Sequence, residues 1–326
     1  MPDPSAAIVS AEVGSTRGRR LLPWTLWLLI LLGVLYLAYT GNQSSIFFWE
    51  AAAVAILFAT STNLLLGYAN MPSFGQAAFY GIGAYTVAEF SAHTAVPIAL
   101  LAAIILSAAA ALLIGLIAVR TRAIAFSMVT LAVGQGLYLL AYQSSLVGGE
   151  NGLPDILPHG FSQVGFWLFL CLVVALALFG YRVLTRTAFG VVLTGIRDDP
   201  KRAEFLGVPI FWRRLAAFTL AGAGAGLAGG LMAYSSGIVT PDMMYWTQAG
   251  YPIFMAILGG MRSFWGPAVG AVILTWLLQS VGQATPAYLL PIGAILLLLL
   301  IVAPNGLISL AQRAVRGARI VHDARD

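Results

Sequence analysis

The chain has few charged residues: 9% of its 326 residues are Asp, Glu, Lys or Arg, whereas 60% are hydrophobic. Soluble domains usually carry about 25% charged residues, so this composition excludes an ordinary soluble fold and indicates a protein folded in the hydrocarbon of a membrane. The single cysteine, Cys171, excludes an intrachain disulfide. The three histidines, His93, His159 and His322, are scattered, and because no metal-ligand spacing is present we expect no metal site.

Lysine is nearly absent too, since Lys201 is the only one. A phosphate-binding P-loop needs Gly-x4-Gly-Lys-Ser/Thr, but Lys201 follows Pro200 and no glycine-rich loop. We therefore expect no ATPase site in this polypeptide, and since paired catalytic carboxylates and a nucleophile elbow are also missing, we expect neither an enzyme nor a cofactor of its own. Residues 224–229, GAGLAG, fit the letters of a dinucleotide fingerprint, but they lie in an apolar run without a preceding strand. We interpret them as a close helix–helix contact.

Long apolar runs are abundant. About 20 apolar residues cross a hydrocarbon core of about 30 Å as a helix, whereas barrel strands would be shorter and would alternate. We therefore expect an all-α, polytopic integral membrane bundle with about ten transmembrane helices, counted as eight to ten. The third and eighth runs are short or rich in Gly, Ser and Pro, and either could be a broken or re-entrant helix lining a cavity. The runs lie near residues 22–40, 47–66, 73–92, 96–119, 123–146, 164–184, 214–236, 248–261, 264–282 and 287–303.

Basic residues predict the orientation. With ten spans and the N-terminus inside, all 17 Lys and Arg residues fall in inside segments, as the positive-inside rule requires. We therefore expect a multi-pass protein of a bacterial inner membrane with both termini in the cytoplasm. The net charge of +5 then reflects this orientation and contact with anionic lipid headgroups, not binding to nucleic acid. The expected divisions are a cytoplasmic tail over 1–21, a membrane domain over 22–303 with a cytoplasmic loop at 185–213, and a basic cytoplasmic tail over 304–326.

The loop from Thr185 to Arg214 is the longest charged segment within the apolar sequence, and with Arg182 it accounts for seven of the 17 basic residues. Asp199 near an N-cap, Pro200 at an early helical position and Gly207 after the last turn predict a short amphipathic helix at the cytoplasmic surface. A solvated positive-inside loop would explain the charges alone. The functional alternative is a docking helix for a cytoplasmic partner.

This loop also carries a family resemblance. Residues 195–208, GIRDDPKRAEFLGV, precede an apolar span and resemble the cytoplasmic coupling loop of LivM-type permeases, subunits of ATP-binding-cassette importers for branched-chain amino acids. Further blocks resemble that family in the same order: 63–85 (NLLLGYANMPSFGQAAFYGIGAY), 122–131 (RAIAFSMVTL), 148–153 (GGENGL) and 258–270 (LGGMRSFWGPAVG).

The resemblance covers roughly residues 60–275 and implies the permease fold together with its partners. These are a second, homologous permease subunit, two cytoplasmic ATPase subunits that bind the ATP, and a periplasmic substrate-binding protein. A second copy of this chain in place of a different permease stays open. The residues that the resemblance assigns to the ATPase-coupling loop are Gly190, Arg197, Asp198, Asp199, Pro200, Lys201, Arg202, Ala203, Glu204 and Gly207.

Polar residues within the apolar runs are the candidates for a translocation pathway, because polar groups in lipid are costly unless they face protein or water. We select Asn63, Ser73, Gln76 and Gln135, with interhelical hydrogen bonding as the alternative role. At Gln76 and Gln135 the chain departs from the family pattern, in which His and Glu are common. Loss of these titratable groups leaves the solute open between branched-chain amino acids, another amino acid, urea or an amide, and an aromatic acid.

Two other classes of transporter remain. An ion-coupled secondary transporter would need an intramembrane acid or an ion-binding backbone break, for which Glu50 and Glu89 are the only acidic candidates. A passive channel for a small neutral solute fits the uncharged helices but not the charged loop. A faint internal similarity, between Leu66–Ala77 and Leu258–Ala268, suggests a parallel repeat about an axis along the membrane normal.

Overall fold

The computed structural model describes residues 43–121, 123–282, 293–294, 297 and 306–308. By its contacts the chain divides into two units, Met1–Phe47 and Phe48–Asp326, and the description below concerns the second. The described residues are helical, apart from loops and one isolated bridge between Leu153 and Val239, which confirms the all-α bundle. The first expected span and the N-terminal tail lie outside the described residues, as do most of the last span and of the C-terminal tail, so the domain boundaries stay predictions.

Eight of the ten expected runs correspond to helices of the structure. Within the described ranges, five helices are long and apolar enough to cross a membrane. The third and eighth runs form short helices, as expected, and the eighth contains Pro252. The long helices are α2 (Gln43–Ala69), α4 (Val96–Ala118), α5 (Ala123–Gln143), α6 (Gln163–Arg186) and α9 (Ile210–Ser236), and the shorter ones are α3 (Gln76–Ser91), α10 (Trp246–Gly259) and α11 (Gly266–Gly282).

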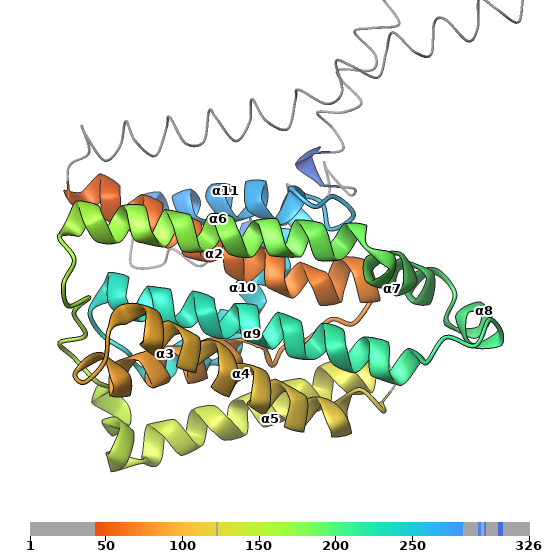
Figure 1. Ribbon diagram of the computed structural model, residues 1–326, viewed down its shortest axis with the longest axis horizontal. Coiled ribbons are helices and arrows are strands. Elements are labelled where there is room, and N and C mark those ends of the chain that lie inside the picture. Colours follow the sequence, from red (N-terminus) through yellow and green to blue (C-terminus); the bar gives the residue numbers. More distant parts are fainter. Residues whose placement is uncertain (1–42, 122, 283–292, 295–296, 298–305, 309–326) are drawn as a thin grey trace, which may run out of the picture. The chain divides into compact units, whose positions relative to one another are not determined.

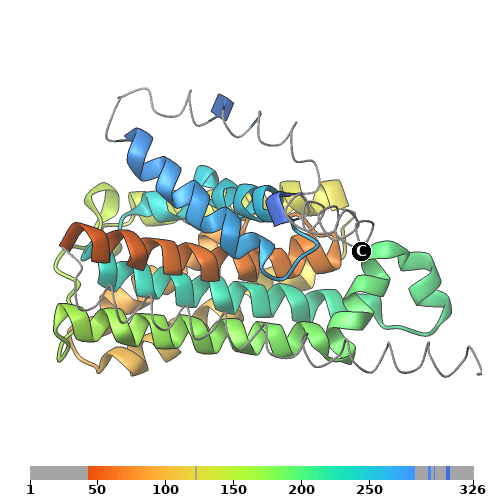
Figure 2. The same cartoon turned by 90° about the horizontal axis from the view of Figure 1, so that it is seen from above.

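Helices α2 and α9 form the centre of the unit (Figure 1). About two thirds or more of the residues in their apolar windows are buried, whereas α4, α5 and α6 bury fewer than a third. Figure 2 shows α11 crossing α2 obliquely. At this crossing Ala59 packs against Met255, Leu274 and Leu277 in a buried apolar cluster. The outer faces of α4, α5 and α6 keep large aliphatic side chains exposed, as expected for surfaces that meet lipid or another membrane subunit.

The glycine-rich stretch of α9 allows the close helix contacts that its sequence predicted. A Cβ on Gly83 of α3 would overlap the carbonyl of Gly226, and one on Gly229 would overlap the carbonyl of Tyr80. From α4, the Ser107 hydroxyl donates to the Phe79 carbonyl at 3.1 Å. Small residues thus let α3, α4 and α9 approach backbone to backbone, and the resemblance of residues 224–229 to a dinucleotide fingerprint has a packing explanation.

Two breaks between helices share a helix–break–helix order, with different backbone conformations inside the breaks. α2 ends at Ala69 and α3 begins at Gln76, while α10 ends at Gly259 and α11 begins at Gly266. The first residue of each break has positive φ, 53° at Asn70 and 113° at Gly260. Both breaks, residues 70–75 and 260–265, contain the letters Met-x-Ser-Phe. The sequence similarity therefore coincides with a shared helix–break–helix structure.

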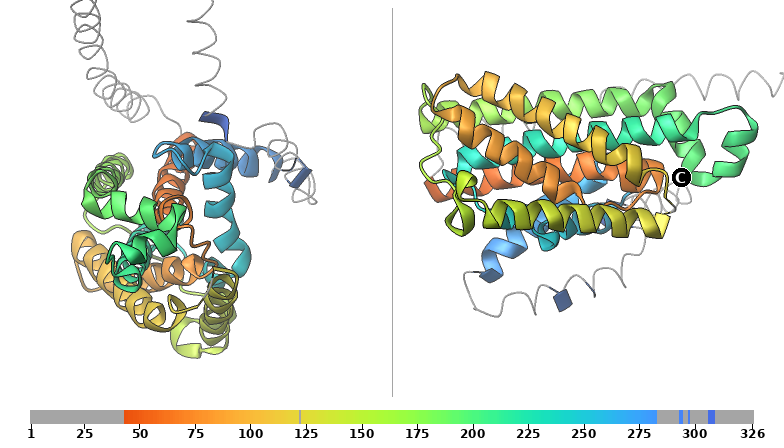
Figure 3. Two further views of the ribbon diagram at one scale, coloured as in Figure 1. Left: turned by 90° about the vertical axis from the view of Figure 1, so that its right-hand side faces the viewer. Right: turned by 90° about the horizontal axis from the view of Figure 1, so that it is seen from below.

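The two ends of the bundle differ in their connections. At one end, α6 leads into α7 (Ala188–Asp198) and α8 (Pro200–Phe205) before α9 begins, and the left view of Figure 3 looks onto this end. At the other end lie three 3-10 turns, η1 (Ser145–Val147), η2 (Gly149–Asn151) and η3 (Pro241–Met244). There Leu153 and Val239 exchange backbone hydrogen bonds of 2.8 and 3.0 Å, so the α5–α6 and α9–α10 connections are joined.

Candidate functional site

A sharp turn between α6 and α7 starts the α7–α8 segment, which we define as residues 188–207. Gly190 is buried at this turn, where an added Cβ would overlap the carbonyl of Thr185. α7 then buries Leu193 and Ile196 while Val191 is exposed, the pattern of a helix with one apolar face. α7 lies within the expected loop but was not anticipated as a separate helix.

Arg197 connects the end of α7 to α2. Its Nη1 donates to the Gly67 carbonyl at 2.8 Å, and its Nε donates to Asp198 Oδ1 at 2.9 Å. Gly67 lies in the last turn of α2, whose carbonyls carry the negative end of the helix dipole, so a cation there is favourable. The hydrogen bond from Arg197 lowers the pKa of the Asp198 carboxyl, and the positive charges of Arg197 and Arg262 act in the same direction.

The short helix α8 has the caps that its sequence predicted. Asp199 is the N-cap, and its Oδ1 accepts a hydrogen bond from the backbone N–H of Arg202 at 3.0 Å. Pro200 occupies the first turn, Ala203 is buried, and Gly207 follows the helix with φ of 78°. The remaining predicted residues of this helix are exposed: Lys201, Arg202 and Glu204.

Two large apolar side chains at the end of α8 are exposed, although no membrane-spanning helix contains them. Phe205 is 91% exposed and Leu206 is 77% exposed. Both residues lie within the family motif of residues 195–208, but they were not among the predicted residues of the coupling loop. The signal that would have found them is an apolar pair after the charged stretch DDPKRAE, where a solvated loop has no need of large hydrophobic side chains.

Two of the four pathway candidates, Ser73 and Gln76, lie at the first break, and a third, Asn63, lies in the last two turns of α2 before it. Asn63 on α2, Ser73 in the break and Gln76 at the start of α3 are each no more than 2% exposed. Gln135 is half-buried on α5. Its neighbour Gly134 approaches the break, with an added Cβ 3.7 Å from the Gly75 Cα. The structure thus brings α5 against the first break, whereas the transport role of these residues stays a prediction.

Hydrogen bonds from α5 anchor the first break. Ser127 donates its hydroxyl to the Pro72 carbonyl at 2.7 Å, and Thr130 Oγ1 accepts from the backbone N–H of Phe74 at 3.3 Å. Within the break, Ser73 Oγ accepts from the Gly75 N–H at 3.3 Å. Ser73 therefore has a structural role in this conformation, and α5 fixes the position at which α3 starts.

The polar turn of α2, which we define as Thr60–Asn63, is buried on every side, since each of its residues is at most 5% exposed. Ser61 donates to the Phe58 carbonyl at 2.9 Å. In contrast, Thr60 Oγ1, Thr62 Oγ1 and Asn63 Oδ1 are buried without a hydrogen-bond partner, as are both amide atoms of Gln76. Buried polar groups in proteins are nearly always paired, so this concentration of orphaned atoms marks a functional candidate.

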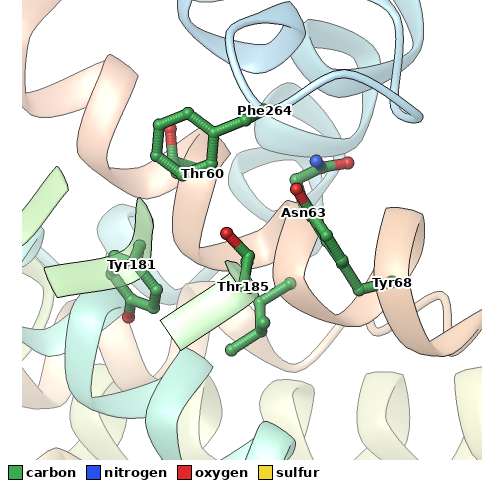
Figure 4. Close-up of a pocket in the computed structure, with 7 residues that line it drawn as sticks. Thr60, Asn63, Tyr68, Tyr181, Thr185 and Phe264 are labelled. Atoms are coloured by element: carbon green, nitrogen blue, oxygen red, sulfur yellow. The ribbon is translucent and has the colours of Figure 1, made fainter. Parts of the chain in front are cut away.

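One face of the polar turn lines a small pocket (Figure 4). Thr60 and Asn63 meet Tyr181 and Thr185 of α6 and Phe264 of the second break there, and Leu64 and Tyr68 complete the lining. The pocket has no room for a water molecule in this conformation. On its rim the Arg182 guanidinium lies 4.8 Å from the centre of the Phe264 ring, a cation–π distance. The pocket is therefore closed in this conformation.

The acidic candidates for ion coupling are far from this pocket. Glu50 is 5% exposed near the other end of α2 and accepts a hydrogen bond from the Ser235 hydroxyl at 2.5 Å. Glu89 is exposed at the end of α3. Among the residues placed by the structure, no three His, Cys, Asp or Glu side chains gather where they could hold a metal ion.

Comparison with known proteins identifies the family. Residues 44–303 match the family described as "Branched-chain amino acid transport system / permease component". The chain is 27% identical to the high-affinity branched-chain amino acid transport system permease protein LivM of Salmonella typhimurium, over 94% of this chain and 78% of that protein. It is 28% identical to LivM of Escherichia coli, over 79% of this chain and 68% of the relative.

A relative with another solute in its name also matches. The autoinducer 2 import system permease protein LsrC of Yersinia enterocolitica is 28% identical, over 81% of this chain and 74% of that protein. No solved structure matches this chain. Since the family match covers most of the chain and agrees with the helical membrane fold, the chain belongs to the permease components of branched-chain amino acid transport systems.

Proposed function

We propose that this chain is the membrane-spanning permease subunit of an ATP-binding-cassette importer, and that it carries branched-chain amino acids or a related small solute across a bacterial inner membrane. The observation that carries the proposal is the family match over residues 44–303, and the helix pair α7–α8 outside the spanning bundle supports it. ATP is bound by two separate cytoplasmic ATPase subunits, and the chain itself has no ATPase site and binds no cofactor. A second, homologous permease completes the membrane part.

The α7–α8 segment is the contact for the ATPase subunits. Its exposed Phe205 and Leu206 offer an apolar surface outside the membrane-spanning helices, and exposed apolar side chains rimmed by charge are typical of protein interaction sites. Arg197 connects this segment to α2 through the Gly67 carbonyl. A push on α8 therefore reaches the helix that carries the polar turn.

Charge supports the orientation. α8 exposes Lys201 and Arg202, whereas the connections at the opposite end, residues 144–162 and 237–245, contain acidic residues and neither Lys nor Arg. By the positive-inside rule, this distribution favours a cytoplasmic position for α7 and α8. The opposite connections, joined through Leu153 and Val239, face the periplasm and receive the substrate-binding protein.

Uptake by intact cells tests the function. We would delete the gene for this chain, restore it on a plasmid, and measure uptake of radiolabelled L-leucine in strains that carry either wild-type ATPase subunits or subunits with the P-loop Lys replaced by Ala. We expect uptake to need both this chain and active ATPase subunits. Uptake that survives the P-loop substitution but is abolished by a protonophore would contradict the proposal and favour an ion-coupled transporter.

A further inference from the structure

The start of α3 lies inside the bundle instead of at its end. α2 continues from Asn63 to Ala69 beyond Thr62, which is about 10 Å of helix at 1.5 Å per residue. The first break then returns the chain before α3 begins at Gln76, as Figure 1 shows. The N-terminus of α3 is therefore set back from the end of α2 that Arg197 contacts.

The register between α2 and α3 brings two orphaned side chains together. The rings of Phe58 and Tyr80 lie in contact, with centroids 4.7 Å apart and planes tilted by 34°, and the two helices run in opposite directions. One turn onward along α2 is Thr62, and one turn back along α3 is Gln76. Because residues four apart lie on the same helix face, Thr62 and Gln76 face the same interhelical space at the start of α3.

The start of α3 has hydrogen-bond donors but no acidic or capping side chain that accepts from them. The N-cap, Gly75, supplies no side-chain hydrogen bond, and the first turn contains no acidic residue. The first backbone N–H groups of a helix have no intrahelical acceptor and carry the positive end of the dipole. Gln76 is 0% exposed and Thr62 is 1% exposed, and neither the amide of Gln76 nor the hydroxyl of Thr62 has a hydrogen-bond partner.

We propose that the N-terminus of α3, with Gln76 and Thr62, is a binding site for the carboxylate group of the transported solute. A carboxylate accepts several hydrogen bonds, which the backbone N–H groups of Gln76 and Ala77, the Gln76 amide and the Thr62 hydroxyl provide, whereas the Ala78 N–H is already bonded to the Gly75 carbonyl at 3.1 Å. No charged side chain of the described part is buried here, as Glu50, the one buried acid, lies about 18 Å away along α2. The site would thus compensate the negative charge of one carboxylate by hydrogen-bond dipoles. This inference rests on the proposed function, the import of an amino-acid-like solute.

Direct binding to the purified full-length chain in lipid nanodiscs tests this site. We would titrate L-leucine, isovalerate and L-leucinamide and follow binding by saturation-transfer NMR. Isovalerate keeps the carboxylate without the ammonium group, and L-leucinamide replaces the carboxylate. We expect saturable binding of the first two and at least about tenfold weaker binding of the amide, the loss expected for a hydrogen bond to a charged group.

Substitutions connect this preference to the site. Gln76→Met, which keeps the length of the side chain without its polar atoms, should remove the preference while the melting temperature stays equal or rises, since an orphaned amide has been removed. Thr62→Val should weaken the preference for the carboxylate over the amide severalfold. This second variant tests the site even if Gln76→Met folds poorly. Gln143→Met, at an exposed position of α5, should leave binding unchanged.

Three results would overturn the inference: no saturable binding of L-leucine, equal binding of L-leucine and L-leucinamide, or an unchanged preference in both Gln76→Met and Thr62→Val. A Gln76→Met variant that melts at lower temperature but binds normally would assign the amide a structural role instead. These results are separable from a failure of the proposed function, because ATP-dependent uptake by cells can persist without a carboxylate preference. Conversely, the preference can be measured on the purified chain even if uptake needs no ATPase.

Discussion

Arg197 donates a hydrogen bond to the carbonyl of Gly67 at 2.8 Å, and this contact connects the α7–α8 segment to the helix with the polar turn. Gly67 and Asn63 are one turn apart on α2, and an added Cβ on Gly67 would lie 2.6 Å from Asn63 Oδ1. Arg197 thereby joins α7 to a carbonyl next to the pocket. Under the proposed function, this relationship would give the ATPase subunits a physical route to buried residues.

Loss of the Arg197 contact should destabilise the protein. In Arg197→Gln the Gly67 carbonyl loses its charged donor, and we expect a decrease of about 1–2 kcal/mol in the free energy of unfolding. Thermal unfolding in nanodiscs, followed by tryptophan fluorescence, measures the change. Lys201→Gln removes the same charge from an exposed position of α8 and is the matched control. Equal effects of the two substitutions would show that charge, not the contact, matters.

The ion pair between Arg197 and Asp198, 2.8 Å apart, predicts a pH dependence. Because the hydrogen bond from Arg197 lowers the pKa of Asp198 in the fold, its contribution to stability is present above the unfolded value of about 3.9 and is lost as pH falls through the lower folded pKa. Asp198→Asn should therefore melt below wild type at about pH 7, and the difference should shrink below about pH 4.

Melting curves across this pH range check the prediction. Glu204→Gln is the control, because Glu204 is exposed on α8 and has no ion pair among the residues that the structure covers. A difference between Asp198→Asn and wild type that is the same at both pH values would contradict the linkage.

Much of the bundle could be predicted from the sequence because long apolar runs permit little else in a membrane. The caps of α8 were also local features, readable from Asp199, Pro200 and Gly207. The separate helix α7 was missed, since its apolar face over Leu193 and Ile196 is only three turns long and is flanked by charges. The contact of Arg197 with Gly67 joins positions far apart in the chain, and no local pattern encodes it.

The unpaired polar atoms of the polar turn also could not be predicted from the sequence. The sequence places four polar residues in an apolar run, but whether each finds a partner depends on the neighbouring helices. Ser61 bonds to its own helix at Phe58, whereas Thr60 and Thr62 have no partner. Only the packed structure separates these cases, and it makes Gln76 a stronger candidate than Gln135.

The packing of α9 predicts a large effect of a single branched side chain. Gly226 faces Ala103 and Ser107 of α4, and an added Cβ would overlap the Ser107 hydroxyl. Gly226→Val should therefore destabilise the fold by about 1–3 kcal/mol or prevent its assembly. Gly180→Val on α6 is the control, because an added Cβ there meets open space. The yield and melting temperature of the two variants measure this difference. Similar values for Gly226→Val and Gly180→Val would contradict the close contact between α9 and α4.

The exposed apolar pair on α8 predicts a separation of function from stability. Phe205→Ser combined with Leu206→Ser should change the free energy of unfolding by no more than about 0.5 kcal/mol and leave the melting temperature nearly unchanged, because both side chains are exposed. Co-purification of the ATPase subunits should fall severalfold, since a partner surface has been lost. Normal co-purification with normal stimulation of ATP hydrolysis would remove this pair from the docking surface.

Site-specific cross-linking tests the central claim that α8 contacts the ATPase subunits. The chain has one cysteine, so Cys171→Ala permits a single new cysteine, introduced either as Phe205→Cys on α8 or as Val164→Cys at the exposed start of α6. A photoactivatable maleimide is attached and the assembled importer is irradiated. The account predicts an adduct with the ATPase subunit from position 205 and none from position 164. An adduct from position 164 alone would contradict it.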